Sequence, residues 1–456
     1  MPETPTLDPA NLHTIFKAYD VRGTVGDQID EELARRVGGA FVQVTGAPTV
    51  VVGHDMRPSS PGLSRAFAEG AARAGADVVL IGLASTDQLY FASGHLDHPG
   101  VMFTASHNPA QYNGIKMCHA GARPIGLDTG LAEIRDLVAT EVVGDRSGVI
   151  TEQDVLADYA AHLLSLAPVE GRPLKVVIDA GNGMAGLTAP AVFGRVDNID
   201  VVPMYFELDG TFPHHEANPI EPANLVDLQA KVRSEKADIG LAFDGDADRC
   251  FLVDERGELV SPSTLTGLIA ARELAREPGS VVIHNLITSR SVPQIVTELG
   301  GSPVRTRVGH SYIKAEMART GAIFGGEHSG HFYFRDFWRA DSGMLAALHA
   351  LAALAETDQP LSALLAEYIR FTASGEINST VSDQGAVLAE LEKTYVDGTG
   401  VSVDHLDGLT FEHDDWWFNV RASNTEPLLR LNAEGKDEAT MAAVRDDALT
   451  VIRRDQ

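Results

Sequence analysis

Runs of apolar, mostly β-branched residues alternate with helix-like segments along most of the chain. In the first part, this pattern predicts strands at residues 49–53, 77–81 and 101–103, with an Ala-rich helix at 64–74 between the first two. Long Val/Ile runs without interspersed polar residues are typical of parallel strands buried on both faces. Strands that alternate with helices in this way predict an α/β fold.

The same order of elements returns twice. The predicted strands are 175–179, 200–205 and 238–243 in the second repeat, and 280–284, 304–308 and 322–324 in the third. Pro203 indicates either a strand at an edge of its sheet or the end of a strand, because proline cannot donate to a neighbouring strand. The third strand of each repeat opens onto a polar loop, and ligands gather at the carboxyl ends of such strands. We therefore expect three tandem mixed or parallel α/β/α repeats around a central cleft.

The composition changes near Thr372, beyond which the predicted strands and helices are shorter. This part of the chain predicts a smaller C-terminal α+β domain. A chain of 456 residues is also too long for a single core. The expected domains are residues 1–150, 151–255, 256–371 and 372–456.

The protein is strongly acidic, with 36 Lys and Arg residues against 64 Asp and Glu residues and a formal charge of −28. This charge argues against non-specific binding to nucleic acid or to an anionic membrane, since both need a basic face. An anionic substrate must therefore be held by a local cluster of Arg, Lys and backbone N–H groups. We expect small molecules as partners.

Neither the cysteines nor the apolar segments indicate an extracellular or membrane protein. Cys118 and Cys250 are too few for a disulfide framework or a structural zinc site. The most apolar helical stretch, residues 344–355, contains His349 and is shorter than the roughly 20 residues that span a bilayer. Residues 1–17 lack the apolar segment of a secretory signal. We expect a cytoplasmic protein that is a monomer or a weak homo-oligomer.

Ser106 lies in a short polar loop after a predicted buried strand. The loop reads Thr-Ala-Ser-His-Asn-Pro over residues 104–109, and its small residues allow a bulky anion to approach the backbone. A rigid strand before the loop can present the Ser106 hydroxyl to a ligand. The segment taken alone is equally consistent with an ordinary polar turn.

Three carboxylates stand at alternate positions after the third strand of the second repeat: Asp244, Asp246 and Asp248. In an extended loop, alternate side chains fall on one side, so their oxygens can converge on one hard cation. An EF-hand is excluded because Arg249 occupies the sixth position, where that loop needs glycine. Three protein carboxylates leave room for a phosphate oxygen, which suits Mg²⁺ better than Ca²⁺.

The loop after the third repeat, Gly-Gly-Glu-His-Ser-Gly-His at 325–331, combines a carboxylate, a hydroxyl and two histidines. A carboxylate that accepts from two neighbouring hydroxyls can recognise a sugar ring, which makes Glu327 a candidate. His331 is a candidate general acid or base because histidine titrates near neutral pH. His328 fits the same role by pattern, so the two remain alternatives.

The segment Arg-Ala-Ser-Asn-Thr at residues 421–425 offers one guanidinium, two hydroxyls, one amide and several backbone N–H groups. Arginine can hold a phosphate with two parallel hydrogen bonds, and successive N–H groups form a nest for an anion. This loop is therefore a candidate phosphate-binding site.

Four segments, taken in chain order, resemble the α-D-phosphohexomutase superfamily: 104–109, 244–249, 325–331 and 421–427. Three others strengthen the resemblance toward its bacterial phosphomannomutase/phosphoglucomutase branch: 19–23, 113–116 and 309–311. The resemblance covers essentially the whole chain. It implies a four-domain α/β isomerase that interconverts hexose 6-phosphate and hexose 1-phosphate. The implied route uses a phosphoserine and hexose 1,6-bisphosphate, which is both intermediate and activator.

The resemblance also implies roles for individual residues. Ser106 would carry the transferred phosphoryl group, and Mg²⁺ would be bound by that group with Asp244, Asp246 and Asp248. The transferred group would be steadied by Arg22, Lys116 and Arg249, with His331 as the proton shuttle. The residues that would bind the sugar and its non-transferred phosphate are Tyr19, His310, Glu327, Ser329, Arg421, Ser423, Asn424 and Thr425.

Two departures from the family pattern leave the preferred sugar open. His328 occupies a position that varies with sugar preference in similar enzymes, and residues 285–287 lack a lysine that relatives often supply. The alternatives are a phosphoglucosamine mutase and a metal-dependent sugar phosphatase. Phosphoglucosamine mutases usually open with a glycine-rich loop unlike residues 19–23, which favours the phosphomannomutase/phosphoglucomutase branch.

Overall fold

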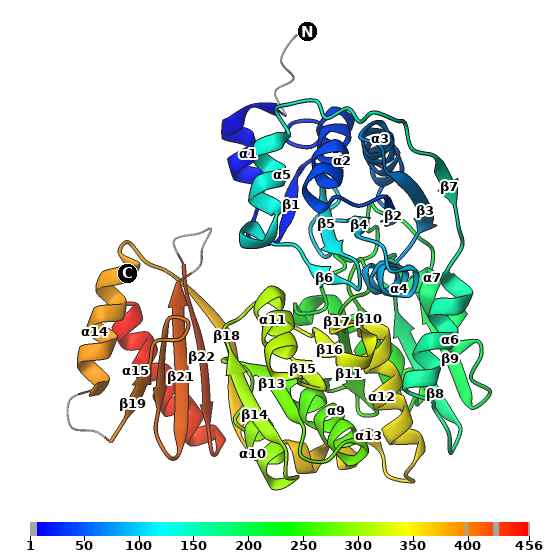
Figure 1. The fold of residues 1–456 in the computed structure, drawn as a ribbon. Coiled ribbons are helices and arrows are strands. Elements are labelled where there is room, and N and C mark those ends of the chain that lie inside the picture. The colour runs from blue at the N-terminus through cyan, green and yellow to red at the C-terminus, as the bar shows by residue number, and fades with distance from the viewer. Residues whose placement is uncertain (1–6, 397–399, 423–427, 455–456) are drawn as a thin grey trace. The chain divides into compact units, whose positions relative to one another are not determined.

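The computed structural model describes residues 7–396, 400–422 and 428–454, except for the side chains of residues 310 and 311. The chain divides into two compact units (Figure 1). The larger unit consists of Met1–Ser261 with Ser329–Leu364, and the smaller unit of Pro262–His328 with Leu365–Gln456.

The first sheet of the larger unit has the strand order β1-β5-β4-β2-β3-β7, with β6 paired to β5. β2 is parallel to β3 and β4, and β3 is parallel to β7, whereas β5 is antiparallel to β1 and β4. The strands are β1 (Asp20–Thr24), β2 (Thr49–His54), β3 (Asp77–Leu83), β4 (Gly100–Phe103), β5 (Tyr112–His119), β6 (Arg123–Pro124) and β7 (Ile150–Glu152). The helices are α1 (Pro9–Ile15), α2 (Glu31–Thr45), α3 (Ser60–Arg73), α4 (Thr86–Leu96) and α5 (Leu131–Leu137).

The Ser106 loop leaves this sheet at the point where the strand order reverses. β3 and β4 flank β2, so the two successive crossovers run to opposite sides of β2. In open α/β sheets such a reversal opens a crevice at the carboxyl ends of the two strands concerned, here β2 and β4. Residues 104–109 follow β4 directly, so the fold presents Ser106 at this crevice.

Local sequence signals set the ends of the helices that pack on this sheet. Asp30 and Ser85 cap α2 and α4, each by accepting a hydrogen bond from an amide in the first turn. Gly46 ends α2 in the left-handed conformation, at φ 63°. α2 and α3 pack closely where Gly70 of α3 faces the backbone of α2. A Cβ added at Gly70 would lie only 1.9 Å from the carbonyl oxygen of Arg35, so a larger residue would force the helices apart.

The second sheet of the larger unit has the order β12-β11-β10-β8-β9. β8 is parallel to β9 and β10, and β10 forms an antiparallel hairpin with β11 whose loop is residues 244–249. β9 contains Pro203 and lies at the edge, as predicted. The strands are β8 (Leu174–Asp179), β9 (Ile199–Met204), β10 (Ile239–Phe243), β11 (Cys250–Asp254) and β12 (Leu259–Val260). The helices are α6 (Leu156–Leu166), α7 (Ala185–Phe193), α8 (Val226–Glu235) and α12 (Gly343–Ala355).

A short antiparallel hairpin, β16 (Phe332–Phe334) and β17 (Ala340–Asp341), precedes α12 in the larger unit.

The smaller unit has three parallel strands in the order β14-β13-β15, where β13 is Val281–Asn285, β14 is Ser302–Thr306 and β15 is Phe324–Gly326. The helices with them are α9 (Pro262–Arg276), α10 (Ser291–Glu298) and α11 (His310–Thr320). α13 (Leu361–Leu365) lies at the boundary between the units.

The C-terminal sheet of the smaller unit is antiparallel throughout, in the order β18-β22-β21-β20-β19. Its elements are β18 (Thr372–Thr380), α14 (Gln384–Val396), β19 (Ser402–Asp404), β20 (Leu409–Glu412), β21 (Trp416–Ala422), β22 (Leu428–Gly435) and α15 (Glu438–Ile452). The prediction of short elements here is wrong, because β18 has 9 residues and α15 has 15. Glycine and polar positions inside β18 masked its length in the sequence. Across the described residues, no helix is long and apolar enough to cross a bilayer.

Candidate active site

Ser106 stands just beyond β4, with its hydroxyl directed at the carboxylate of Asp244. Oγ of Ser106 donates to Oδ2 of Asp244 at 2.7 Å, and the residue is only 5% exposed. Its backbone has φ +51°, a left-handed conformation that residues other than glycine adopt uncommonly. The amide of Ser106 donates to Oγ1 of Thr104 at 2.9 Å. Backbone strain that the surroundings maintain at a single hydroxyl is characteristic of functional sites.

Arg57 holds the carbonyl groups of the same loop, a role that sequence reasoning missed. Its guanidinium is completely buried and donates at 2.7 to 3.0 Å to the carbonyl oxygens of Ser106, Asn108, Pro109 and Tyr112. The sequence places Arg57 in a turn after β2, but its acceptors lie 49 to 55 residues further along the chain. Local patterns carry no signal for contacts of that range.

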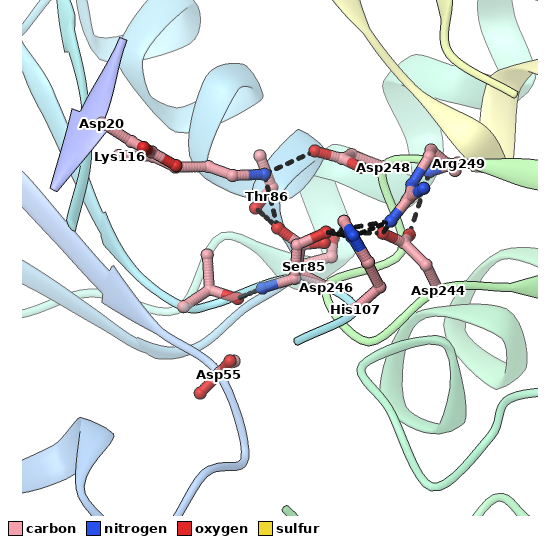
Figure 2. Close-up of polar contacts among 12 residues, drawn as sticks. Asp20, Asp55, Ser85, Thr86, His107, Lys116, Asp244, Asp246, Asp248 and Arg249 are labelled. Carbon is pink, nitrogen blue, oxygen red and sulfur yellow. Dashed lines mark hydrogen bonds and ion pairs between the residues drawn. The ribbon is translucent and has the colours of Figure 1, made fainter. Parts of the chain in front are cut away.

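Asp244, Asp246 and Asp248 come together in the hairpin loop between β10 and β11 (Figure 2). Candidate ligand atoms of the three carboxylates all lie within 4.8 Å of one another, and no residue of this triad is more than 1% exposed. Lys116 on β5 places its Nζ 2.7 Å from Oδ2 of both Asp246 and Asp248. The structure therefore brings the predicted serine, lysine and carboxylates into one group.

The hydrogen bonds distinguish the two oxygens of each carboxylate. Oδ2 of Asp246 accepts from Thr86 and Lys116, whereas its Oδ1 is buried and accepts no hydrogen bond. Oδ1 of Asp248 is also buried, and Nε2 of His331 lies 3.4 Å from it. Buried carboxylate oxygens without a donor are costly unless a cation takes them. A set of hard oxygen donors suits Mg²⁺. The residues present therefore fit the predicted metal.

Burial and charge act in opposite directions within this group. Burial raises the pKa of Asp244 to about 7, although the Arg249 cation opposes the rise. Burial also favours the neutral form of Asp248, but Lys116 and His331 outweigh it and hold the pKa of Asp248 well below its ordinary value. Burial would lower the pKa of Lys116, yet the neighbouring carboxylates raise it well above its ordinary value. Lys116 is therefore a permanent ammonium beside the triad.

Two arginines surround the Ser106 hydroxyl and its loop. Arg249 places Nε 2.9 Å from Oδ2 of Asp244 and Nη2 3.3 Å from Oγ of Ser106. Arg22 on β1 donates at 2.6 Å both to Asp20 and to the side-chain oxygen of Asn108. The Nε of Arg22 is buried without a hydrogen-bond acceptor, so this guanidinium has donor capacity left for an anion.

His107 lies between the serine and Arg249. Its Nδ1 is 3.3 Å from Oγ of Ser106, and it contacts Nη2 of Arg249 (Figure 2). Burial, together with the Arg249 cation, holds the pKa of His107 well below its ordinary value. His107 is therefore a neutral imidazole that accepts a hydrogen bond from Arg249, so it adds no positive charge beside this arginine.

His331 lies beside the triad. Its Nε2 is 3.4 Å from Oδ1 of Asp248 and 3.8 Å from Oδ2 of Asp341, and its Nδ1 is 3.0 Å from Oγ of Ser329. Burial lowers the pKa of His331, but the two carboxylates more than compensate and raise it above its ordinary value. His328 belongs to the smaller unit, where burial lowers its pKa. His331 therefore lies beside the triad, and its role as the proton carrier stays a prediction.

The smaller unit contains further candidates for sugar and phosphate binding. Glu327 is buried, and its Oε1 accepts from the Gly309 amide at 3.1 Å and from Nδ2 of Asn285 at 3.2 Å. Asn285, which the sequence did not single out, thus helps to orient Glu327. Arg421 lies next to the last residue of β21 and pairs with Glu376 at 3.3 Å.

Most of the remaining predicted binding residues lie outside the described part of the chain. These are Ser423, Asn424 and Thr425, together with the side chain of His310. Tyr19 is half-buried and directly precedes β1. The binding roles of the first four stay predictions from the sequence, and so does that of Tyr19.

Models of known protein families match the chain in four stretches. The three α/β/α domains of phosphoglucomutase/phosphomannomutase match residues 13–142, 157–257 and 262–371, and its C-terminal domain matches 376–451. The chain belongs to the phosphoglucomutase/phosphomannomutase family. It is thus a phosphohexomutase, an isomerase of carbohydrate metabolism. The predicted fold of three α/β/α domains and a C-terminal domain is confirmed.

Relatives match the chain over nearly its full length. A protein of Xanthomonas campestris pv. campestris described as "Phosphohexose mutases" is 40% identical over 444 residues, which are 96% of this chain and 99% of that protein. A phosphomannomutase of Salmonella typhimurium is 39% identical over 450 residues, 96% of this chain and 98% of that protein. The crystal structure of a phosphoglucomutase/phosphomannomutase family protein from Burkholderia thailandensis matches with a TM-score of 0.88 and 34% identity, covering 97% of both chains.

Proposed function

We propose that this chain interconverts hexose 6-phosphate and hexose 1-phosphate as a phosphomannomutase/phosphoglucomutase, through phospho-Ser106 and a hexose 1,6-bisphosphate. The observation that carries the proposal is the 2.7 Å hydrogen bond from Oγ of Ser106 to Asp244 inside a buried carboxylate triad. A serine hydroxyl beside a cation site and two arginines is suited to accept and return a phosphoryl group. Relatives of 39% identity over nearly the whole chain are named phosphomannomutases.

Phosphoryl transfer needs alignment and charge neutralisation more than covalent help from the protein. A phosphoserine brings about −1.5 to −2 charges. Mg²⁺ held by Asp244, Asp246, Asp248 and the phosphoryl group would act as a Lewis acid and offset part of this charge. Lys116 and Arg249 supply fixed cations at the same place, because both are buried and ion-paired to the triad.

The reaction has two transfers that mirror each other. In the first, the free hydroxyl of the bound hexose phosphate attacks phosphorus, the new O–P bond forms and the P–Oγ bond of Ser106 breaks. Oγ leaves as an alkoxide, which Nη2 of Arg249 stabilises from 3.3 Å. His331 accepts the proton of the attacking hydroxyl at Nε2, where Asp248 and Asp341 stabilise the imidazolium. The bisphosphate then turns end for end. In the second transfer the Ser106 alkoxide attacks the other phosphoryl group, and the bond from that phosphorus to the sugar oxygen breaks. His331 gives its proton to this sugar oxygen.

Other groups of the chain hold the far end of the ligand. Glu327, with its carboxylate fixed by the Gly309 amide, accepts hydrogen bonds from sugar hydroxyls, and Ser329 adds one more contact. Arg421 would grip the non-transferred phosphate, and Glu376 would have to release it for that. The further phosphate and sugar contacts are those predicted for Tyr19, His310, Ser423, Asn424 and Thr425.

The competing functions make different predictions for the products. A metal-dependent sugar phosphatase would release inorganic phosphate with every turnover and would need no bisphosphate. A phosphoglucosamine mutase would prefer the amino sugar, but the relatives of this chain do not favour this alternative. The deciding experiment offers mannose 1-phosphate, glucose 1-phosphate and glucosamine 1-phosphate in parallel, with and without a trace of hexose 1,6-bisphosphate. Isomerisation of mannose or glucose phosphate that the bisphosphate stimulates supports the proposal, whereas stoichiometric phosphate release contradicts it.

Two properties stay predictions from the sequence alone. These are a cytoplasmic location and a monomeric or weakly homo-oligomeric state. Fractionation and sedimentation of the purified protein would test both.

A further inference from the structure

Asp246 is held at two points by a residue outside the predicted motifs. Oγ1 of Thr86 donates to Oδ2 of Asp246 at 2.6 Å, and the amide of Thr86 donates to the backbone carbonyl of Asp246 at 2.9 Å (Figure 2). Both residues are completely buried, and they are 160 positions apart in the sequence. Thr86 therefore fixes both the backbone and the carboxylate of one predicted metal ligand.

The hydroxyl of Thr86 decides which oxygen of Asp246 is left for a cation. Oδ2 accepts from Thr86 and from Nζ of Lys116, so two donors saturate it. Oδ1 is buried and accepts nothing. Without the hydroxyl, Lys116 alone would restrain the carboxylate, and rotation about its bond to Cβ could turn Oδ1 away from the other two carboxylates.

We propose that Thr86 is a positioning residue for the divalent cation: it orients Asp246 so that Oδ1 faces the ion, and Asp87 holds Thr86 in place. The proposal rests on the proposed function in so far as the triad binds such a cation. Partners of ligating side chains commonly orient the ligands, and their loss typically weakens metal binding about 10- to 100-fold. Thr86 itself touches neither phosphate nor ion in this role.

Asp87 anchors the start of α4, where Thr86 lies. Its buried carboxylate accepts from the hydroxyl of Tyr159 on α6 at 2.7 Å, from Oγ of Ser342 at 2.6 Å and from Oγ of Ser85. Ser342 is also the N-cap of α12 and Ser85 the N-cap of α4. One carboxylate thus ties three helices together next to Thr86. Because Asp87 holds the start of α4 by these three hydrogen bonds, the Thr86 hydroxyl has a defined position. A residue that orients a metal-ligating side chain needs such a position.

Direct ion binding tests the role of Thr86. Mn²⁺ is titrated calorimetrically into the full-length, dephosphorylated protein, comparing wild type with Thr86→Val and Thr86→Ser. Valine keeps the shape and the amide of Thr86 but lacks the hydroxyl, so Kd for Mn²⁺ should rise about 10- to 100-fold. Serine keeps the hydroxyl, so its Kd should stay within about 3-fold of the wild type. Thr45→Val is the matched control, since the Thr45 hydroxyl bonds only the Phe41 carbonyl of its own helix among the described contacts.

An unchanged Kd in Thr86→Val, or an equal loss in Thr86→Ser, would overturn the role of Thr86. Thr86→Ala carries the same expectation as valine if the valine variant does not fold. In turnover, Thr86→Val should need more Mg²⁺ for half-maximal rate while kcat at saturating Mg²⁺ is largely restored. If the wild type is an active isomerase and Thr86→Val binds Mn²⁺ with an unchanged Kd, only the role of Thr86 is refuted. If the wild-type protein binds no divalent cation, the assignment of the triad as a metal site is refuted.

The role of Asp87 is tested by coupling. Asp87→Asn should also raise Kd for Mn²⁺, and the double variant with Thr86→Val should bind little more weakly than Thr86→Val alone, because both changes act through one contact. Additive losses would show that Asp87 acts by another route and would overturn that part of the proposal. Thermal unfolding of each variant confirms that the compared proteins are folded.

Discussion

Nη2 of Arg57 donates a hydrogen bond to the backbone carbonyl of Ser106 at 2.9 Å. The same carbonyl packs against Gly245, where an added Cβ would lie 2.4 Å from the oxygen. The left-handed backbone of Ser106 is therefore held by a buried guanidinium and by the loop of residues 244–249. We expect the conformation of the phosphoryl carrier to depend on both neighbours.

Replacing Arg57 by lysine should disable the enzyme although the charge is kept. A lysine ammonium cannot reach the four carbonyls that the planar guanidinium serves, so buried acceptors lose their donors. Each buried acceptor left unsatisfied costs about 1–3 kcal/mol, so the free energy of unfolding should fall measurably in urea titrations. Phosphate release per isomerisation should rise in the fraction that folds, because a mobile phosphoserine admits water. Arg65→Lys on α3, an exposed arginine, should change neither quantity.

Gly245→Ala should slow phosphorylation of Ser106. The new Cβ would meet the Ser106 carbonyl at 2.4 Å, and a contact that short forces the backbone to move. We expect at least a roughly 10-fold fall in the rate of phosphate incorporation from a hexose bisphosphate, since small misplacements of reacting groups cost about that much or more. Gly385→Ala, whose Cβ would meet only one side chain at 3.5 Å, is the control. Equal rates in both variants would contradict the expected clash.

Lys116→Met should have an effect on ion binding opposite to that of Thr86→Val. The ammonium of Lys116 competes with a cation for the same carboxylates, lying 2.7 Å from Asp246 and Asp248. Its removal should tighten binding of Mn²⁺ by about 10-fold or more, because the repulsion between the ammonium and the ion is lost. Two like charges about 4 Å apart interact by roughly 4 kcal/mol near a protein surface. The isomerase rate should nevertheless fall, since one fixed cation at the transferred phosphoryl group is gone. Weaker ion binding would show that Lys116 orients the triad rather than competing with the ion.

The stability of the protein should depend on pH through Asp87. Burial raises the pKa of Asp87 from 3.8 to about 6, although the hydroxyls of Ser342, Ser85 and Tyr159 oppose the rise. The folded chain therefore binds this proton more tightly than the unfolded chain, so the contribution is present at low pH and is lost as the pH rises through about 6. The difference amounts to about 3 kcal/mol.

Asp87→Asn removes this titration. The free energy of unfolding of wild type minus that of the variant should decrease by about 3 kcal/mol between about pH 4 and pH 7 in urea titrations, then stay level. A difference that is flat or that increases over this range would contradict the raised pKa. Comparing the two proteins at each pH cancels the titration of all other groups that they share.

The sequence predicted those features that hydrophobic periodicity and strand ends determine. Pro203 marked an edge strand, and the loops after β4 and β10 were found because polar residues replace an apolar run there. By contrast, the pairing of β5 with β1 and β4 was not foreseen, since antiparallel neighbours leave no mark in the single strand. The nine-residue β18 was underestimated for a related reason, because most of its residues are exposed or half-buried.

The residues of the candidate site also fall into those that the sequence revealed and those that only the structure revealed. Ser106 and the triad are recognisable because each lies on a short segment with a distinctive spacing. Arg57, Thr86 and Asp87 were missed because their function depends on partners about 50 to 255 residues away, which only the folded chain brings close. For the same reason the sequence left His331 and His328 as alternatives, and only the folded chain shows that His331 contacts Asp248.

The central claim is that Ser106 carries the phosphoryl group between the two ends of the sugar. It is tested most directly by incubating wild type and Ser106→Ala with radiolabelled glucose 1,6-bisphosphate and measuring label and intact mass of the protein. The wild type should gain one phosphoryl group on Ser106 and pass it to unlabelled hexose phosphate, while Ser106→Ala should take up no label and lose nearly all turnover. Undiminished labelling of Ser106→Ala would contradict the account.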